Sequence, residues 1–171
     1  HSSRLLAMTQ VRDKKIRFAS LDLIGNLLRQ GQVNPNETVP FLLALQGDVE
    51  ENAIRALALK LLMIEGEKRP DMLRQRVCAG VKQASLFQHS VYPDKEDVSA
   101  LVKIMKNGSS QTECVFGGVY KECISSMKKQ RRGLFRNLLG LFDLQNKRSG
   151  ETNGQKAQLS DGEIFLADLP L

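Results

Sequence analysis

The sequence predicts an all-α fold of HEAT-type helical repeats, a segment of an α-solenoid. Apolar residues recur at helical spacing in successive segments, and Gly, Asn and Pro turn signals separate these segments. The tract 16–19 (IRFA) also returns imperfectly as the tract 54–58 (IRALA), 38 residues later. That interval is close to the roughly 40–47 residues of helix-pair repeats. An arginine one turn after an acidic group can tie successive helix pairs together, so Arg17 and Arg55 are expected to have a structural role.

The first expected helix runs from Val11 to Gln30 and ends at Gly31. Its predicted buried stripe is Ile16, Ala19, Leu23, Ile24, Leu27 and Leu28. After an Asn-Pro-Asn turn at 34–36, a second helix is expected from Glu37 to Leu45, with Asn36 or Thr38 as its cap.

A third helix is expected from Glu50 to Glu65 and is apolar nearly all round, which indicates a helix between two neighbours. A fourth should run from Pro70 or Asp71 to about Val91, since Pro is favoured at a helix start. Gly80 lies within the apolar stripe of this helix, where it predicts the close approach of another helix.

The acidic tract 94–97 is interpreted as the cap and first turn of a short helix, Asp97 to Lys106, rather than as a carboxylate cluster. Asn107-Gly108 would end this helix. The next helix should begin at Thr112, with an apolar stripe that extends to Met127. A stripe of this kind is more often core than a cofactor site.

A basic, amphipathic helix is expected over 126–143 (SMKKQRRGLFRNLLGLFD). Lys129, Arg132 and Arg136 share one face, and Arg131 falls nearer the apolar side. The predicted apolar side consists of Leu134, Phe135, Leu138, Leu139, Leu141 and Phe142. Residues 1–145 are thus predicted to be the repeat segment, 146–162 a polar flexible loop, and 163–171 (EIFLADLPL) the start of a further, truncated helix. The chain reads as a piece of a longer protein.

The formal net charge of +6 is concentrated near this helix. Residues 128–148 contain seven basic side chains and one acidic side chain, a net of +6, so the rest of the chain is neutral in sum. Such a patch suits nucleic acid, an acidic protein segment or a membrane surface. A solvated face that binds nothing is the alternative.

The sequence has no motif that indicates catalysis, a metal site or a cofactor. Gly117-Gly118 lies in a helical pattern without a preceding strand, so it is not a phosphate loop. Cys78, Cys114 and Cys123 have no metal-ligand spacing and are expected to be buried, reduced thiols. No apolar run is long enough to cross a membrane.

Three blocks of the sequence resemble the C-terminal domain of the cohesin-loading factors, the Nipped-B family of sister chromatid cohesion proteins. The first is 16–45 (IRFASLDLIGNLLRQGQVNPNETVPFLLAL) and the second, looser block runs from Glu51 through Arg55 and Gly80 to Gln88. The third is Arg131-Arg132 followed by LFRNLLGLFD. The tract 94–110 aligns poorly, and 146–162 looks like a lineage-specific insertion.

The resemblance implies a hook-shaped HEAT-repeat solenoid that engages double-stranded DNA together with the ATPase heads and kleisin of the cohesin complex. It implies a nuclear, chromatin-bound protein that stimulates cohesin's ATPase, without an active site or cofactor of its own. The small tetratricopeptide partner of the loader is expected to bind outside this fragment. No membrane partner is expected.

We therefore expect a helical scaffold in which Lys128, Lys129, Arg132 and Arg136 contact DNA and Arg131 positions them. The alternative is a scaffold whose basic face binds an acidic protein segment, such as part of the kleisin, without direct DNA contact. An enzyme would require residues outside this segment to complete a site.

Overall fold

The computed structural model describes residues 2–93, 101–106, 109–114, 116–124 and 131–140, and between 101 and 113 it describes the backbone alone. The longer helices are α1 (Ser2–Met8), α2 (Lys14–Arg29), α3 (Pro35–Ala44), α4 (Asn52–Lys68) and α5 (Pro70–Val91). A short 3₁₀ turn, η1 (Leu45–Gly47), follows α3. Beyond α5 lie the strands β1 (Leu101–Lys106) and β2 (Ser109–Cys114), the short helix α6 (Gly117–Val119), the π-helical turn η2 (Tyr120–Ile124) and a helix over 131–140.

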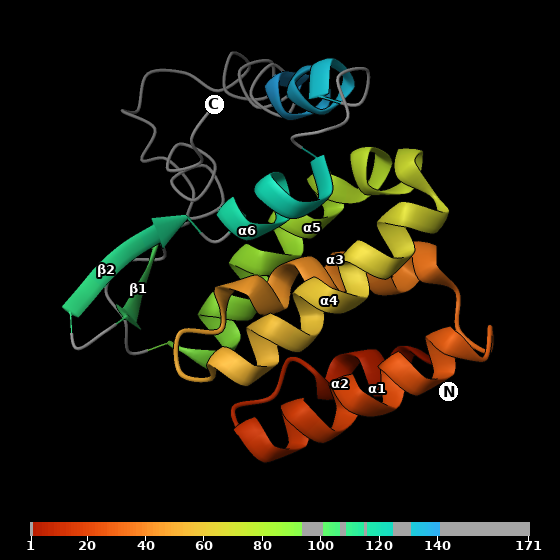
Figure 1. Ribbon diagram of the computed structural model, residues 1–171. Helices are drawn as coiled ribbons and strands as arrows, with labels where there is room; N and C mark the ends of the chain where they lie inside the picture. The colour runs from red at the N-terminus through yellow and green to blue at the C-terminus, as the bar shows by residue number, and fades with distance from the viewer. Residues whose placement is uncertain (1, 94–100, 107–108, 115, 125–130, 141–171) are drawn as a thin grey trace, which may run out of the picture.

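The helices form two adjoining layers, as expected for stacked helix pairs (Figure 1). In one layer α3 packs on α5, and in the other α2 packs on α4, which in turn contacts α6 and η2. Each helix pair connects the two layers: α1 contacts α2 in the first pair, and α3 contacts α4 in the second. The predicted all-α, helical-repeat class is therefore confirmed, and α4 has a neighbour on each side as its apolar composition indicated.

The helix starts follow local capping chemistry. The Asp13 carboxylate accepts hydrogen bonds from the backbone N–H groups of Lys15 and Ile16, so α2 begins at Lys14 rather than at Val11. Asn34 caps α3 by accepting from the backbone of Asn36. The expected caps Asn36 and Thr38 were wrong because Pro35 already occupies the first helical turn. The fourth helix has the predicted bounds, and α1 is an element that the sequence analysis does not predict.

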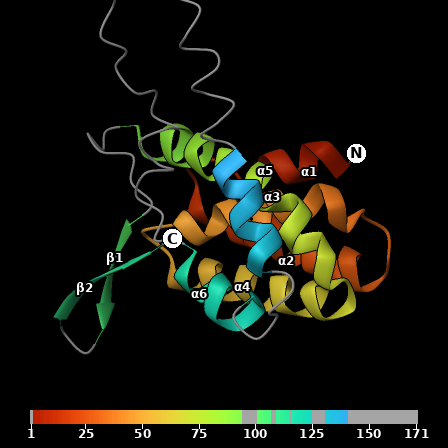
Figure 2. The ribbon, with the colours of Figure 1, turned by 90° about the horizontal axis from the view of Figure 1, so that it is seen from above.

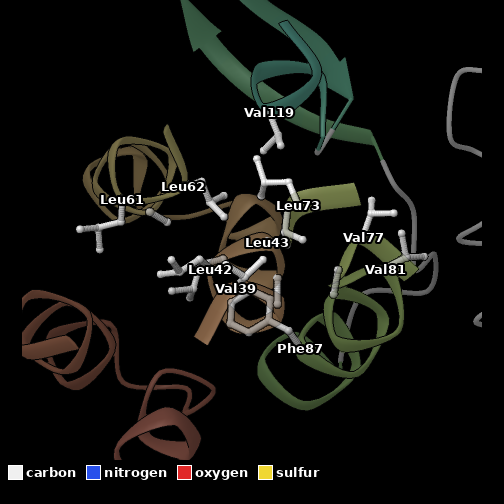
Figure 3. Packing of buried hydrophobic residues seen from close by; sticks show 14 of the residues in the cluster. Val39, Leu42, Leu43, Leu61, Leu62, Leu73, Val77, Val81, Phe87 and Val119 are labelled. Atoms are coloured by element: carbon white, nitrogen blue, oxygen red, sulfur yellow. The ribbon is translucent and has the colours of Figure 1, made fainter. Parts of the chain in front are cut away.

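The core lies between the two layers, where side chains from α3, α4 and α5 interdigitate (Figure 3). Leu43, Leu62 and Phe87 are almost fully buried. Gly80 of α5 lies directly against Leu43 of α3: a β-carbon on Gly80 would lie 2.3 Å from Leu43 Cδ1. The predicted close helix approach at Gly80 is thus confirmed, and it brings α3 and α5 together.

The predicted buried stripe of α2 was partly wrong. Ile24 and Leu28 are buried, but Ile16 and Leu23 expose 40% and 47% of their surface, and Ala19 is exposed too. The face that packs on the neighbouring helices contains Arg17, Ser20, Leu21 and Gly25 instead. The buried face is rotated because Arg17 points inward to a carboxylate, which an apolar pattern does not reveal.

The helices expected over 97–106 and from Thr112 were also wrong. β1 and β2 form an antiparallel hairpin in which Lys106 pairs with Ser109, leaving two residues, 107 and 108, between the strands (Figure 1). Asn-Gly between two strands favours a tight hairpin turn, and the tract 101–105 (LVKIM) is rich in strand-forming residues. The next helical segment begins only at Gly117, so the expectation that no strand precedes Gly117-Gly118 was wrong. Cys114 therefore ends a strand and does not share a helix with Cys123.

The hairpin lies between α5 and α6, at one side of the helical layers (Figure 1). It interrupts the series of helices, which continues beyond it with α6 and η2 packed on α4. The acidic tract 94–97, the polar tract 146–162 and the apolar tract 163–171 lie outside the described residues, as do Met127, Leu141 and Phe142.

Candidate nucleic-acid interface

The helix over 131–140 lies across α5 at one end of the stack (Figure 2). Leu134 and Leu138, four residues apart, are its buried anchors, with exposed fractions of 4% and 8%. Phe135 is half-buried, and its ring centroid lies 6.5 Å from that of Tyr120 in η2. The side chain of Leu139 is 51% exposed, so its predicted place on the buried side was wrong. Within 131–140, the buried face of this helix therefore contains fewer apolar residues than the sequence predicted.

Two contacts from side chains to backbone carbonyl oxygens hold this helix close to α5. The Asn137 side-chain amide donates to the carbonyl oxygen of Arg74 at 3.1 Å, and the Cys78 thiol contacts the carbonyl oxygen of Asn137 at 3.4 Å. A β-carbon on Gly133 would lie 2.5 Å from Cδ of Arg74. Glycine at 133 therefore allows the two helices to cross with the Arg74 side chain between them.

The crossing presents Arg132 and Arg136 to solvent. Both are exposed and stand four residues apart, on the side of the helix away from Leu134 and Leu138. Arg131 is half-buried at the start of the helix. Lys128 and Lys129 lie outside the described residues, so the structure brings together two of the four side chains expected to bind DNA.

Two basic residues of α5 that the sequence analysis missed lie beside this helix. Arg74 reaches Gly133 and also forms an ion pair with Asp71, with 3.6 Å between Nη2 and Oδ1. Lys82 is exposed one turn beyond Cys78, close enough for its charge to act on that thiol. Arg74, Cys78 and Lys82 are spaced four residues apart, and this spacing could have predicted that they share one face of α5.

A cavity of about 310 Å³ lies on the apolar side of the 131–140 helix, between this helix and α3, α5, α6 and η2. Its walls are apolar, with Leu43, Val77, Phe116 and Phe135 among them, and Tyr120 is its polar-tipped member. Such a lining suits an apolar side chain rather than a charged group.

The three cysteines are free thiols; Cys123 is buried as predicted, but the prediction was wrong for Cys78 and Cys114, which are half-buried. Desolvation, together with the charges of Glu122 and Glu67, raises the pKa of Cys123 to about 11. Desolvation also raises the pKa of Cys78 and Cys114, although the nearby Lys82 ammonium opposes this rise at Cys78. Raised thiol pKa values are the opposite of what a nucleophilic or metal-binding cysteine requires.

Arg17 lies at a buried junction of several segments, far from the basic helix. Its Nε donates to Asp48 Oδ2 at 2.8 Å, and its Nη1 donates to the carbonyl oxygens of Val11 and Arg12. The Tyr92 hydroxyl donates to Asp48 Oδ1 at 2.8 Å. The guanidinium also lies 6.0 Å from the ring centroids of Phe87 and Tyr92.

Arg55, the counterpart of Arg17 in the repeated tract, is also buried. It donates to the backbone carbonyl of Asp48 and, at 3.2 Å, to the side chain of Asn52. Both arginines therefore contact Asp48 in the turn between α3 and α4. Arg17 thus joins α2 to this turn, whereas the Arg55 contacts lie within the α3–α4 pair.

Within the described ranges, no cluster of His, Cys, Asp and Glu could hold a metal ion. Among the helices that the structure describes, none is long and apolar enough to span a membrane. Stacked helix pairs with an exposed basic helix define this chain as a helical-repeat scaffold.

The chain belongs to the sister chromatid cohesion C-terminus family, whose Nipped-B model matches residues 1–168. It is 24% identical over 132 residues to Nipped-B-like protein A of Danio rerio and 23% identical over 128 residues to Nipped-B-like protein B of the same species. These alignments cover 77% and 75% of this chain but 5% and 4% of the relatives. The chain thus spans a small part of the length of the relatives that it matches.

Proposed function

We propose that this chain is part of a cohesin loader, a nuclear protein that promotes the loading of the cohesin ring onto chromatin. In this proposal the helix pairs are a scaffold, and the 131–140 helix and the lysines that precede it in the sequence, Lys128 and Lys129, contact DNA. Membership of the sister chromatid cohesion family supports the process. The exposure of Arg132 and Arg136, opposite the buried anchors Leu134 and Leu138, supports the DNA contact.

The proposed contacts are to phosphates. Arg132 and Arg136 lie one helical turn apart and face solvent, and Arg74 and Lys82 extend the positive surface onto α5. Phosphate contacts carry no sequence information, so binding should show little sequence preference. Lys128 and Lys129 belong to the same proposed site by their positions in the sequence.

The partners follow from the same family membership. We propose that the scaffold acts beside the cohesin ATPase heads and the kleisin, and that it stimulates ATP hydrolysis without an active site of its own. The raised thiol pKa values argue only against a cysteine nucleophile, because they disfavour the thiolate.

The experiment is a salt titration of binding to a random DNA duplex. Removing one phosphate-binding side chain should reduce the slope of log affinity against log salt by about 0.9. The variant Arg132→Glu/Arg136→Glu should therefore bind weakly at low salt, with a slope shallower by about 2. The control is Arg4→Glu/Lys60→Glu, which changes the net charge equally at exposed sites on α1 and α4. The melting temperatures of both variants should stay close to that of the parent protein.

The apolar cavity favours a second candidate function, the binding of an acidic protein segment with an apolar anchor. Phe135 lines the cavity and Arg136 follows it in the same helix, so a segment that wraps around this helix could reach both. An acidic peptide and duplex DNA offered together would separate the two functions. Unchanged DNA affinity in the Arg132→Glu/Arg136→Glu variant, with loss of peptide binding, would replace the DNA proposal with the peptide one.

A further inference from the structure

The apolar cavity beside the 131–140 helix is larger than an ordinary packing defect. Protein interiors contain few voids larger than a water molecule, and an engineered apolar cavity of about 150 Å³ already binds benzene. The cavity in this protein measures about 310 Å³. Leu43, Val77 and Val119, which line it from α3, α5 and α6, are labelled in Figure 3. It therefore has room for a molecule with two fused rings.

Aromatic side chains are concentrated around this cavity. The chain has seven Phe, two Tyr and no Trp, and three of these nine rings, Phe116, Tyr120 and Phe135, line the cavity. The ring centroids of Tyr120 and Phe135 lie 6.5 Å apart, with an angle of 51° between the ring planes. Aromatic rings attract one another at centroid distances of about 4.5–7 Å, in offset or edge-to-face arrangements. The lining thus favours a planar aromatic ligand.

The walls of the cavity offer few polar groups. Every lining residue that the structure describes is uncharged, and only Cys114 and Tyr120 among them carry a polar side-chain atom. The Cys114 sulfur already accepts hydrogen bonds from the backbone of Phe116 and Gly117. A charged group would lose its hydration in such a site without gaining a partner. The ligand is therefore uncharged and has at most one hydrogen-bonding group, which Tyr120 can satisfy.

One wall of the cavity has an unusual backbone conformation. The π-helical turn η2 contributes Tyr120 and Ile124 to the lining. Turns of this kind are rare in proteins and occur frequently at functional sites. Another wall is the apolar side of the 131–140 helix, so a molecule in the cavity would contact both segments.

We propose that this cavity binds a small, uncharged aromatic molecule, and that the bound molecule stabilises the 131–140 helix in its place on α5. Leu134 and Leu138, the buried anchors of this helix, also line the cavity and would gain an apolar partner there. The proposal does not depend on the DNA contact. A small molecule fits better than the apolar anchor of an acidic segment, because Arg132 and Arg136 lie on the side of the helix away from these anchors.

The test uses indole, an uncharged two-ring molecule with one N–H donor. The full 171-residue chain contains no Trp, so the fluorescence of added indole can be followed without a tryptophan background. Its emission should shift to shorter wavelength in the apolar cavity and reach saturation. Val77→Phe places a ring in the cavity and should weaken binding at least about tenfold. Leu86→Phe is the matched control, because Leu86 lies on the same helix, is 61% exposed and is not a lining residue.

A second measurement, hydrogen exchange, locates the bound indole. Exchange of the backbone amides of 131–140 should slow at saturating indole, because the occupied cavity disfavours local opening of this helix. Unchanged exchange there would overturn the proposal, as would the absence of a saturable shift in the parent protein or equal affinities in Val77→Phe and Leu86→Phe.

Two further outcomes are separated in the same assay. If Val77→Phe loses its helical circular dichroism, Cys114→Leu, a smaller change at another wall of the cavity, replaces it under the same criterion. Displacement of indole by an acidic peptide with a single Phe would also overturn the proposal, because a protein segment would then be the occupant.

Discussion

Arg17 and Asp48 form a fully buried ion pair that joins two successive helix pairs. Their Nε and Oδ2 atoms lie 2.8 Å apart, and both side chains are 0% exposed. Arg17 belongs to α2, whereas Asp48 lies in the turn that leads into α4 and also accepts from the backbone N–H groups of Glu50 and Glu51. This guanidinium and this carboxylate therefore help to fix the relative position of the two pairs, together with the packing of α2 on α4.

Arg17→Met should destabilise the protein strongly. The substitution leaves the Asp48 carboxylate buried without its cation, and removing one partner of a buried pair costs about 3–5 kcal/mol. Chemical denaturation would measure the loss. Lys14→Met is the control, since Lys14 and Glu51 form a largely exposed pair at 3.7 Å and should contribute less than about 1 kcal/mol. Similar losses for both variants would contradict the structural role of Arg17.

Gly80→Ala should separate α3 from α5. The new methyl group would lie 2.3 Å from Leu43 Cδ1 and 2.8 Å from Leu43 Cβ, so Leu43 and the helix backbones must shift. Overpacking of this kind costs about 1–3 kcal/mol, more than alanine recovers through its helix propensity. Gly140→Ala is the control, because an added β-carbon there meets nothing within 4 Å. A melting temperature of Gly80→Ala at or above that of the parent would refute the close contact.

Tyr92 should make the protein sensitive to alkaline pH. Burial, followed by the charge and hydrogen bond of Asp48, raises the pKa of Tyr92 above its usual 10. Tyr92 therefore makes its full contribution to stability below about pH 10, where its hydroxyl is protonated in both the folded and the unfolded state. As the pH rises further, the unfolded state loses its proton first, so stability falls until the folded-state pKa is passed.

The measurement is the free energy of unfolding between pH 8 and about pH 11. It should decline more steeply in the parent than in Tyr92→Phe, by up to about 1.4 kcal/mol per pH unit. Tyr120→Phe is the control, because Tyr120 is 38% exposed and lies outside the Arg17 junction. An equally steep decline in Tyr92→Phe would show that other groups cause the alkaline sensitivity.

Cys123 should resist alkylation in the folded protein. Its side chain is buried, and a pKa of about 11 leaves only about 0.1% thiolate at pH 8. Iodoacetamide labelling followed by peptide mass spectrometry should give a much slower rate in buffer than in urea. Rapid labelling of native Cys123 would contradict its burial.

The sequence by itself determined much of the helical architecture. Pro70 and the apolar stripe from Val77 to Val91 predicted α5 with its observed bounds, because local propensity and one-sided burial agree along the helix. Gly80 also indicated the contact with α3, since glycine within a buried stripe allows close approach. The amphipathic pattern around Leu134 and Leu138 likewise predicted the exposure of Arg132 and Arg136.

The hairpin was predictable in principle but was missed. Asn107-Gly108 is compatible with the end of a helix as well as with a tight turn, so the strand-forming residues before it were the deciding signal. The acidic tract before Val98 favoured a helix start and outweighed that signal in the sequence analysis. Pairing with β2 gives the tract 101–106 the backbone partners that a strand requires.

Only the tertiary structure decided which face of α2 is buried and where the basic surface extends. An arginine normally avoids the core, and Arg17 is buried because Asp48, 31 residues away, supplies its counter-charge. Arg74 lies beside the 131–140 helix because the two helices cross, which depends on glycine at 133 and on a hydrogen bond from the Asn137 side-chain amide to the Arg74 carbonyl oxygen. Helical periodicity thus comes from local sequence, whereas the identity of each neighbour depends on contacts between distant residues.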